Sequence, residues 1–446
     1  MANPMFDVKT LPALASDLAR EIGRVYEASV PMPTAGSAIP PIPRTGRGMA
    51  RLPELWSMIA DRSAHLASPW MSGHMDTAPH PAAALTASLV AALNNNLLFR
   101  ELSPFASDIE EQLITHFAKA LGLGEDWGGV FASGGSIAGL TALFAAVGGY
   151  AGGVDRERVH LFLPESCHLS LKKSATVLGI GARRIHMITC DDAGRMDPAA
   201  LTKALRAIPL KARAIVVSVL GTTIHGSVDD VEAIGAICKR FDAWHHVDAI
   251  YGGALAYSKQ HRGFLSGLAG ADSVAIGPQK WMYVPRVSAI CFIRDRDRLE
   301  EALGVALPYS LGGQPHRGRL GLQGSRPADA VVLWASLQTM GTDALGAHVD
   351  RMIDLAGQFH RLLADSDLFQ PAHVPDLNLQ VFRVGGRDET GARLAVLQAN
   401  LVANQATWMS ISRWRDETYL RCVLLSPSLT EAHLHQFLRD VARAAN

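Results

Sequence analysis

Apolar residues recur at helical spacing near the start of the chain, which predicts an amphipathic helix within residues 1–30. One face of this helix carries four of them, Leu14, Leu18, Ile22 and Tyr26. Prolines then crowd residues 31–43, and because proline disfavours helix at its own position and at the one before it, we expect this stretch to be extended. Such an arm needs a surface to order it, and either a partner subunit or the chain's own domain would serve.

The centre of the chain consists of short apolar runs separated by helical segments. The runs cover residues 129–132, 159–163, 184–189, 214–220, 245–249, 273–276 and 287–293. Several are apolar on consecutive residues, as in parallel strands that are covered on both faces. A capping box at Ser107–Glu110 predicts the start of a further helix, which Gly122 ends. The pattern therefore predicts an α/β domain with a mainly parallel sheet.

A glycine-rich, polar stretch from Gly312 to Gly324 separates this domain from the C-terminal part of the chain. Beyond it the pattern predicts a long helix over 328–363, a strand over 377–384, a helix near 389–403, a strand near 419–425 and a final helix. We therefore expect three parts. They are an N-terminal helical and proline-rich arm (1–75), a large α/β domain (76–311), and a C-terminal part (312–446) with a mobile loop, a connecting helix and a small α+β domain.

Composition narrows the class of protein. The 446 residues include 42 Lys and Arg against 42 Asp and Glu, so no net charge attracts nucleic acid or an anionic membrane. No apolar run reaches the ~20 residues that span a bilayer, and no signal peptide is visible. Five scattered cysteines without metal-ligand spacing favour a reduced, cytoplasmic enzyme without a bound metal over a secreted disulfide-rich protein.

Candidate chemistry begins at Ser133-Gly134-Gly135-Ser136, which joins a predicted strand directly to a helix. Two glycines at this position let backbone N–H groups approach a phosphate, and the N-terminus of the helix adds positive potential. A plain tight turn explains the same residues equally well.

Three further strand ends carry charged or reactive side chains, at the edge where such sheets bind ligands. Asp248 would hold a protonated ring nitrogen, or else cap the turn that comes after it. Lys280 lies beside Trp281, and an apolar environment would lower the pKa of its amine and make it nucleophilic, whereas a surface lysine would be solvated. His168 would stack on a flat cofactor or belong to a turn, and Cys167 beside it lacks the other ligands that a metal needs.

A phosphate cradle, an acid for a ring nitrogen, a nucleophilic lysine and a stacking histidine together fit pyridoxal 5′-phosphate. The sequence also resembles the group II pyridoxal-phosphate-dependent amino-acid decarboxylases, the family of aromatic-amino-acid and glutamate decarboxylases, from about residue 68 to the C-terminus. The matching blocks are Ser68–Met75, Leu102–Pro104 within residues 94–110, Ser133–Ser136, Cys167-His168, Leu220–Thr223, His246–Ala249, Pro278–Trp281, Gly324–Arg326 and Tyr419–Arg421.

The resemblance implies an α/β fold, the type I fold of pyridoxal-phosphate-dependent transferases (aspartate-aminotransferase-like), and a homodimer with active sites at the subunit interface. It assigns a Schiff base to Lys280, the ring nitrogen to Asp248 and ring stacking to His168. It implies further cofactor contacts from Ser133, Gly134, Gly135, Thr223, Ala249 and Gln279. Substrate contacts are expected from His74, Phe105 and Arg421.

Two arginines are candidates for binding a substrate carboxylate, because a guanidinium group matches a carboxylate with two parallel hydrogen bonds. These are Arg421 and Arg326, and either one would serve equally as a structural ion-pair residue.

The sequence departs from the family pattern at several positions. Gln279 stands where the family has a histidine, and Ile137-Ala138-Gly139 replaces Glu-Ala-Asn after the cradle. No tyrosine lies between Ser310 and Gly324, where the family carries the tyrosine that returns a proton to the substrate. His316 is a candidate for this acid, because an imidazole titrates near neutral pH, or else a solvated loop residue. Tyr309, just outside the loop, is a weaker candidate.

Three hypotheses about function arise from these residues. The first is decarboxylation of an L-amino acid to its amine by a carboxy-lyase of amino-acid metabolism. The second is aldehyde formation or Cα–Cβ cleavage on the same cofactor, which the missing tyrosine favours. The third, a catalytically silent dimer, is disfavoured because Lys280, Asp248 and His168 are all retained.

Overall fold

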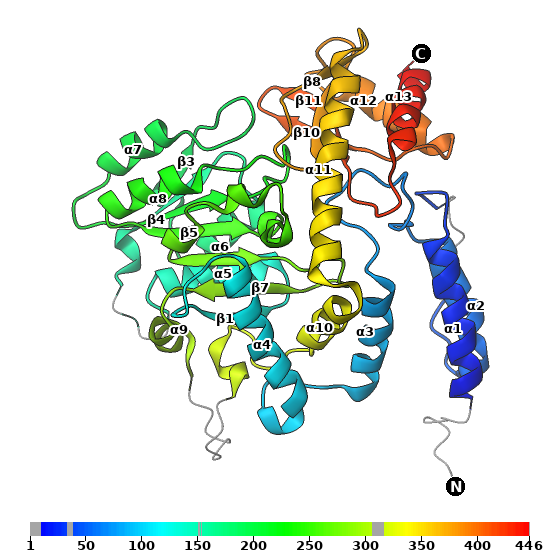
Figure 1. Ribbon diagram of the computed structural model, residues 1–446, viewed down its shortest axis with the longest axis horizontal. Helices are drawn as coiled ribbons and strands as arrows, with labels where there is room; N and C mark the ends of the chain where they lie inside the picture. The colour runs from blue at the N-terminus through cyan, green and yellow to red at the C-terminus, as the bar shows by residue number, and fades with distance from the viewer. Residues whose placement is uncertain (1–9, 34–38, 150–151, 153, 306–315, 446) are drawn as a thin grey trace. The chain divides into compact units, whose positions relative to one another are not determined.

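The computed structural model describes residues 10–33, 39–149, 152, 154–305 and 316–445 (Figure 1). The described chain divides into two compact units. The larger unit comprises Pro79–Arg361 and Pro371–Val381, and the smaller one lies within Met1–Ala78, Leu362–Gln370 and Phe382–Asn446. The division into three parts that we expect from the sequence stays a prediction.

A seven-stranded sheet forms the centre of the larger unit, in the order β1-β7-β6-β5-β4-β2-β3. Its strands are β1 (Gly128–Ala132), β2 (Val159–Pro164), β3 (Ile185–Ile188), β4 (Arg213–Val219), β5 (Trp244–Ala249), β6 (Ser273–Ile276) and β7 (Ala289–Ile293). Neighbouring strands from β6 to β3 are parallel, whereas β7 runs antiparallel to both β6 and β1. The predicted α/β fold with a mainly parallel sheet is therefore confirmed.

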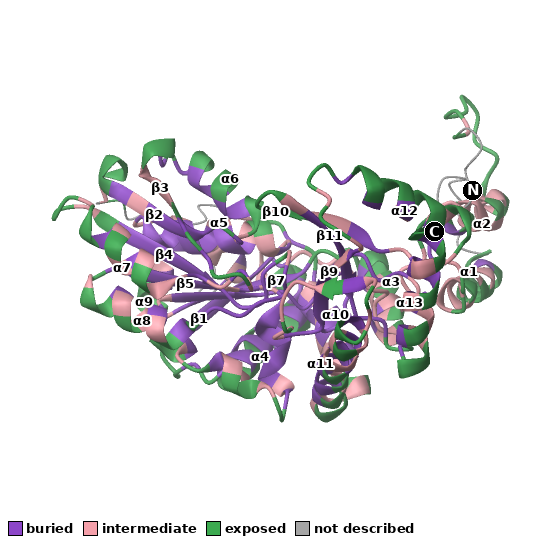
Figure 2. Cartoon of the chain, turned by 90° about the horizontal axis from the view of Figure 1, so that it is seen from above, coloured by how far each residue is buried: buried purple, intermediate pink, exposed green. Residues whose placement is uncertain are grey.

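Helices cover this sheet on both faces, which explains the continuous apolar runs in the sequence. On one face Ile215 and Val217 pack in a core shared with helices α5, α6 and α9. On the other face Ala214 and Val216 pack in a core shared with α7 and α8. The helices are α5 (Gly135–Ala146), α6 (Leu169–Val177), α7 (Pro198–Arg206), α8 (Val231–Arg240) and α9 (Arg296–Leu303). Figure 2 shows the strands between them as buried.

Two sequence predictions about helices are corrected. The helix expected over 328–363 is two helices, because Gly341 takes a left-handed backbone with φ of 77° between them. The helix expected from Ser107 begins earlier, after Ser103, and the Ser107 hydroxyl donates to the Ser103 carbonyl oxygen inside it. The four remaining helices of the larger unit are α3 (Pro81–Leu93), α4 (Pro104–Ala120), α10 (Asp329–Met340) and α11 (Thr342–Ala364), the last of which crosses the boundary between the units.

A second sheet has four strands in the order β10-β11-β9-β8, with β10 antiparallel to β11. Its strands are β8 (Phe369–Pro371), β9 (Leu379–Val384), β10 (Ser410–Trp414) and β11 (Glu417–Val423). The helices of the smaller unit are α1 (Leu11–Tyr26), α2 (Leu52–Asp61), α12 (Ala392–Ala403) and α13 (Glu431–Ala445). Short 3₁₀ helices occupy Met49–Arg51, Arg100–Leu102, Arg156–Arg158, Ala182–Arg184, Gly252–Tyr257, Arg262–Leu265, Leu268–Gly270 and Arg317–Leu320.

The start of the proline-rich stretch is ordered by residues of its own unit. The Pro31 carbonyl oxygen accepts the His65 N–H at 3.0 Å, and the Ser68 hydroxyl donates to the Ser29 carbonyl oxygen at 3.2 Å. Among the described residues, no helix combines the length and apolar character needed to cross a membrane.

Candidate active site

Parallel strands bring three of the predicted site residues to one edge of the large sheet. Asp248, near the end of β5, pairs in register with Val219 of β4 and with Ala275 of β6. Lys280 follows the end of β6, in a turn where its N–H donates to the Gly277 carbonyl oxygen at 2.9 Å. His168 follows β2 and precedes the first residue of α6. The polar residues thus stand where the carboxyl ends of parallel strands place ligands.

Asp248 is electrostatically coupled to both of its predicted neighbours. Burial raises the pKa of its carboxyl group, whereas a hydrogen bond from the Ile250 N–H at 3.2 Å and the nearby charges of His168 and Lys280 lower it. The side chain keeps some accessible surface. The charges of His168 and Lys280, in the turns that follow β2 and β6, therefore act on the Asp248 carboxyl group.

The turn after β2 fixes the orientation of the His168 ring. Its Nδ1 accepts the Ser170 N–H at 3.3 Å and lies 2.7 Å from the Ser170 hydroxyl. Because Nδ1 is an acceptor, the proton of the neutral ring belongs on Nε2. Burial raises the pKa of the adjacent Cys167 to about 12, so this thiol stays protonated and is a poor nucleophile and metal ligand.

The Ser133–Gly135 turn has the backbone of a cradle for an anion. Gly134 has a φ of 86°, a conformation that favours glycine, and a Cβ at Gly135 would lie 3.0 Å from the Ile250 side chain. The Ser133 N–H and hydroxyl both donate to Oε1 of Gln323, at 3.0 and 2.7 Å. Two donors of the cradle therefore converge on one oxygen atom.

The remaining predicted cofactor residues occupy different settings. Oε1 of Gln279 accepts the Ser288 N–H at 2.7 Å and would lie 3.6 Å from a Cβ at Gly134, so Gln279 lies beside the cradle. Ala249 is buried in β5, whereas Thr223 is exposed. The roles of these residues stay predictions.

His316 is buried, so its interpretation as a solvated loop residue is wrong. Its Nδ1 accepts the Arg100 N–H at 3.2 Å and lies 3.5 Å from the Glu101 carboxylate. Its ring packs edge-to-face on Phe99, with 5.3 Å between the ring centroids. Tyr309 and the rest of the 306–315 segment lie outside the described residues.

Glu110 is an important buried residue that the sequence pattern misassigned to a capping box. It is fully buried and forms ion pairs with Arg326 at 3.0 Å and with Arg317 at 3.3 Å. Burial raises the pKa of the Glu110 carboxyl group, but the two guanidinium groups together lower it by more, so the net shift is downward. Arg326 is thus engaged in a structural ion pair. The place of Glu110 on the buried face of α4, beside Leu113 and Ile109, is the sequence signal of a paired internal charge.

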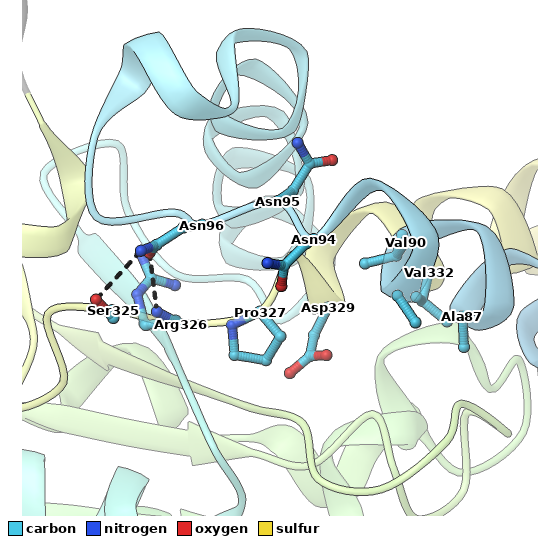
Figure 3. A pocket seen from close by; sticks show the side chains of 11 residues that line it. Ala87, Val90, Asn94, Asn95, Asn96, Ser325, Arg326, Pro327, Asp329 and Val332 are labelled. Carbon is cyan, nitrogen blue, oxygen red and sulfur yellow. Dashed lines mark hydrogen bonds between the residues drawn. The ribbon is translucent and has the colours of Figure 1, made fainter. Parts of the chain in front are cut away.

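A cavity of about 440 Å³ lies beside Arg326 in the larger unit (Figure 3). Asn96 binds two other residues of the lining: its amide donates to the Ser325 hydroxyl at 3.2 Å, and its Oδ1 accepts the Arg326 N–H at 3.4 Å. Its lining is Ala87, Val90, Ala91, Asn94, Asn95, Asn96, Ser325, Arg326, Pro327, Asp329 and Val332. Phe105 of the same unit is 63% exposed and packs edge-to-face on Trp334.

Two predicted substrate residues, His74 and Arg421, belong to the smaller unit. The ring of Trp408 packs on Gly73 so closely that a Cβ there would lie 1.9 Å from a ring carbon. The exposed His74 ring lies 4.9 Å from the Trp408 ring. Nη1 of the buried Arg421 donates to the Gly73 carbonyl oxygen at 2.6 Å. The segment around Gly73 is thus packed against Trp408 and held by Arg421.

Residues 54–384 match the family described as the pyridoxal-dependent decarboxylase conserved domain. The chain belongs to this family. The acidic amino acid decarboxylase GADL1 of Xenopus tropicalis is 29% identical over 307 residues, which cover 65% of this chain and 59% of that protein. The L-2,4-diaminobutyrate decarboxylase of Rhizobium meliloti (strain 1021) is 27% identical over 423 residues, which cover 91% of this chain and 84% of that protein. The chain thus spans just under three-fifths of the first relative's length.

Solved structures of similar fold are numerous. Mouse CSAD has a TM-score of 0.91 at 21% identity, covering 99% of this chain and all of that one. A Rhodiola rosea 4-hydroxyphenylacetaldehyde synthase has a TM-score of 0.87 at 22% identity, covering 99% of each chain. The predicted type I fold is therefore confirmed.

The cofactor of this decarboxylase family member is pyridoxal 5′-phosphate, and the residues of the larger unit fit it. The convergent donors of Ser133 suit an oxygen of the phosphate group. The carboxylate of Asp248 suits the protonated ring nitrogen, and His168 and Lys280 lie within electrostatic reach of it.

Proposed function

We propose that this chain decarboxylates an L-amino acid to the corresponding amine, with Lys280 as the residue that bonds to the cofactor. The observation that carries this proposal is the coupling of Asp248 to both His168 and Lys280 at one edge of the sheet. The three residue types that the chemistry requires stand at the ends of three different strands, at the edge where such sheets bind ligands, which supports a common site. Membership of the pyridoxal-dependent decarboxylase family supports the reaction type.

Each of these side chains has a defined task. When bound, the cofactor withdraws the electron pair that remains on Cα after the carboxylate leaves. The Asp248 carboxylate keeps a proton on the ring nitrogen, which makes that withdrawal effective. His168, oriented by Ser170, packs on the ring, and Lys280 supplies the amine. Ser133, Gly134 and Gly135 hold the phosphate, Gln279 lies beside this cradle, and Thr223 and Ala249 are proposed as further cofactor contacts.

A proton must then return to Cα, and we propose His316 as its donor. The Arg100 N–H donates to Nδ1, so the neutral ring carries on Nε2 the proton that it would transfer. Packing against Phe99 fixes the plane of the ring. The absence of a tyrosine between Ser310 and Gly324 leaves this task to another residue.

We propose that the substrate is recognised by His74, Phe105 and Arg421. The guanidinium of Arg421 suits the α-carboxylate, because its planar donors match two carboxylate oxygens. Its Nη1 is held by the Gly73 carbonyl oxygen, which orients the group before substrate binds. The exposed ring of Phe105 offers apolar surface for a side chain.

We also propose that the enzyme is a cytoplasmic homodimer. One face of α3 exposes Leu85, Leu89 and Leu93, each with more than half of its surface accessible. Phe105 adds to the exposed apolar area. Contiguous apolar surface of this kind is typical of protein interfaces. Light scattering coupled to size-exclusion chromatography tests the dimer, and a monomer at micromolar concentration would refute it.

The experiment that tests the reaction is a product analysis. The cofactor-loaded protein is incubated with a panel of L-amino acids, and products are identified by mass spectrometry, with Lys280→Ala as the control. We expect an amine that has lost the mass of carbon dioxide, with no product from the control. The visible absorbance band that arises from the bond between Lys280 and the cofactor should also be lost in Lys280→Ala.

A second function is favoured by one feature, the absence of the loop tyrosine. Without an efficient proton donor, the carbanion is exposed to other reactions, and the alternative is an aldehyde-forming or Cα–Cβ cleaving enzyme of specialised metabolism. Both the tryptamine-bound Oryza sativa TDC and the Rhodiola rosea synthase share the fold. An aldehyde or a cleaved side chain in the product analysis would establish this alternative.

A further inference from the structure

Gln323 occupies the acceptor position of the Ser133 cradle. Its Oε1 receives both the N–H and the hydroxyl of Ser133, at 3.0 and 2.7 Å. One oxygen that accepts two converging donors is the arrangement that a phosphate oxygen adopts at the N-terminus of a helix. The described chain therefore satisfies its own anion-binding donors with a neutral amide.

The segment that carries Gln323 runs along the edge strand of the sheet. Arg317 donates to the carbonyl oxygen of Gly129 in β1. A Cβ at Gly321 would lie 3.3 Å from the side chain of Val130, the next residue of β1. Gln323 then reaches Ser133, directly after the end of β1. The segment thus leads from the start of β1 to the cradle.

The backbone on both sides of Gln323 is fixed, whereas its link to the cradle is a flexible side chain. Arg317 and Arg326 both form ion pairs with the buried Glu110. Asn96 also binds Ser325 and Arg326, as the dashed lines in Figure 3 show. Because Gln323 has three rotatable side-chain bonds, its amide can leave Ser133 while these anchors stay in place.

We propose that Gln323 is a stand-in for the cofactor phosphate. Its amide holds the Ser133 donors in the cofactor-free protein and lowers cofactor affinity by competing for them. A phosphate accepts charge-assisted hydrogen bonds, which are stronger than those to a neutral amide, so the cofactor displaces Gln323. The inference rests on the proposed role of the Ser133–Gly135 cradle. It assigns to this chain a residue that sets how readily the enzyme fills with its cofactor.

The test measures binding rather than turnover. Isothermal titration calorimetry gives the Kd of pyridoxal 5′-phosphate, and separately of inorganic phosphate, for the full-length Lys280→Ala protein, in which binding is non-covalent. Adding Gln323→Ala should lower both Kd values about fivefold or more, the order expected when the acceptor of two competing hydrogen bonds is removed. Gln323→Glu should raise both about tenfold or more, because a carboxylate binds Ser133 more tightly and repels phosphate. Gln112→Ala, an exposed glutamine of α4, is the matched control and should change neither.

The outcomes separate this inference from the proposal on which it rests. Ser133→Ala should weaken binding of both ligands, and if it leaves both Kd values unchanged, the cradle itself is refuted. If Ser133→Ala weakens binding but Gln323→Ala weakens it too or has no effect, the cradle stands and the stand-in role of Gln323 is overturned. Tighter binding in Gln323→Ala with weaker binding in Gln323→Glu supports the inference.

Discussion

Arg326 and Glu110 form a bidentate ion pair inside the larger unit, with Nη2 3.0 Å from Oε1 and Nη1 3.0 Å from Oε2. The two residues are 216 positions apart in the chain, and the carboxylate is fully buried. Arg317 binds the same carboxylate from the other side. A single acidic side chain thus ties helix α4 to both ends of the segment that carries Gln323.

Replacing Glu110 with Gln should strongly destabilise the protein. The substitution leaves the buried Arg326 guanidinium without its paired carboxylate and leaves Arg317 only Glu111 among the described residues, at 4.0 Å, which costs on the order of 3–5 kcal/mol of unfolding free energy. Asp108→Asn is the control, because it breaks the more exposed ion pair with Arg100 and should cost about 1 kcal/mol or less. Urea unfolding gives the free energy of unfolding of both variants, and an equal loss in Glu110→Gln and Asp108→Asn would contradict this prediction.

The Gly73→Ala variant should lose both stability and substrate affinity. The added Cβ has no space beside Trp408, and overpacking of this kind costs roughly 1–3 kcal/mol. Any shift of the Gly73 carbonyl also moves Arg421. Gly23→Ala in α1 is the matched control, since nothing lies within 4 Å of a Cβ there, and it should stabilise the protein by about 0.5–1 kcal/mol. Thermal unfolding and KM measurements check both variants.

Stability should fall as the pH drops below 6.5, because histidines are buried in the neutral form. Burial lowers the pKa of His245 from its ordinary value of 6.5 to about 3, and that of the adjacent His246 to about 4. The folded protein therefore binds fewer protons than the unfolded chain in this range. Each such histidine adds up to about 1.4 kcal/mol per pH unit to the slope of the unfolding free energy against pH.

His245→Asn should flatten this slope between pH 6.5 and 4, whatever it does to stability at neutral pH. The variant removes one titrating group and keeps a polar side chain that can bond to Ser218, the present partner of His245 at 2.8 Å. Urea unfolding at a series of pH values gives the slope. An unchanged slope would mean that His245 does not titrate in the unfolding transition.

Arg421→Lys should raise KM about ten- to a hundredfold with a smaller effect on kcat. A lysine keeps the charge but lacks the paired donors that suit a carboxylate, and hydrogen bonds to charged groups carry this order of binding energy. Arg413→Lys, at an exposed position of β10, is the control. A fall in kcat with unchanged KM would reassign Arg421 to the chemical step.

The strand-end residues were predictable from the sequence because their positions depend on local patterns. An apolar run that ends in Asp248 or is followed by Lys280 marks the carboxyl end of a strand wherever the strand lies in the sheet. Gly341 offered a comparable local signal, since a glycine at that point ends a helix, but the long apolar periodicity around it concealed the break.

Other features depend on residues far apart in the sequence, so no local pattern identifies their partners. Glu110 fits the letters of a capping box, and its true partners lie more than 200 positions away. The surroundings of His316 come from Phe99 and Arg100, again from a distant segment. Gln323 was missed for the same reason, because nothing in the sequence near it indicates that it meets Ser133.

The antiparallel return of β7 has a consequence for how the protein is made. β1 lies at the edge of the sheet beside β7, and Val130 pairs with Cys291 across 161 positions of sequence. A nascent chain on the ribosome therefore has no strand partner for β1, the strand that leads into the Ser133 turn, until residues 289–293 have been synthesised. The proposed phosphate cradle is consequently complete only after about two thirds of the chain has been made, so it offers no template around which the first half of the protein could fold.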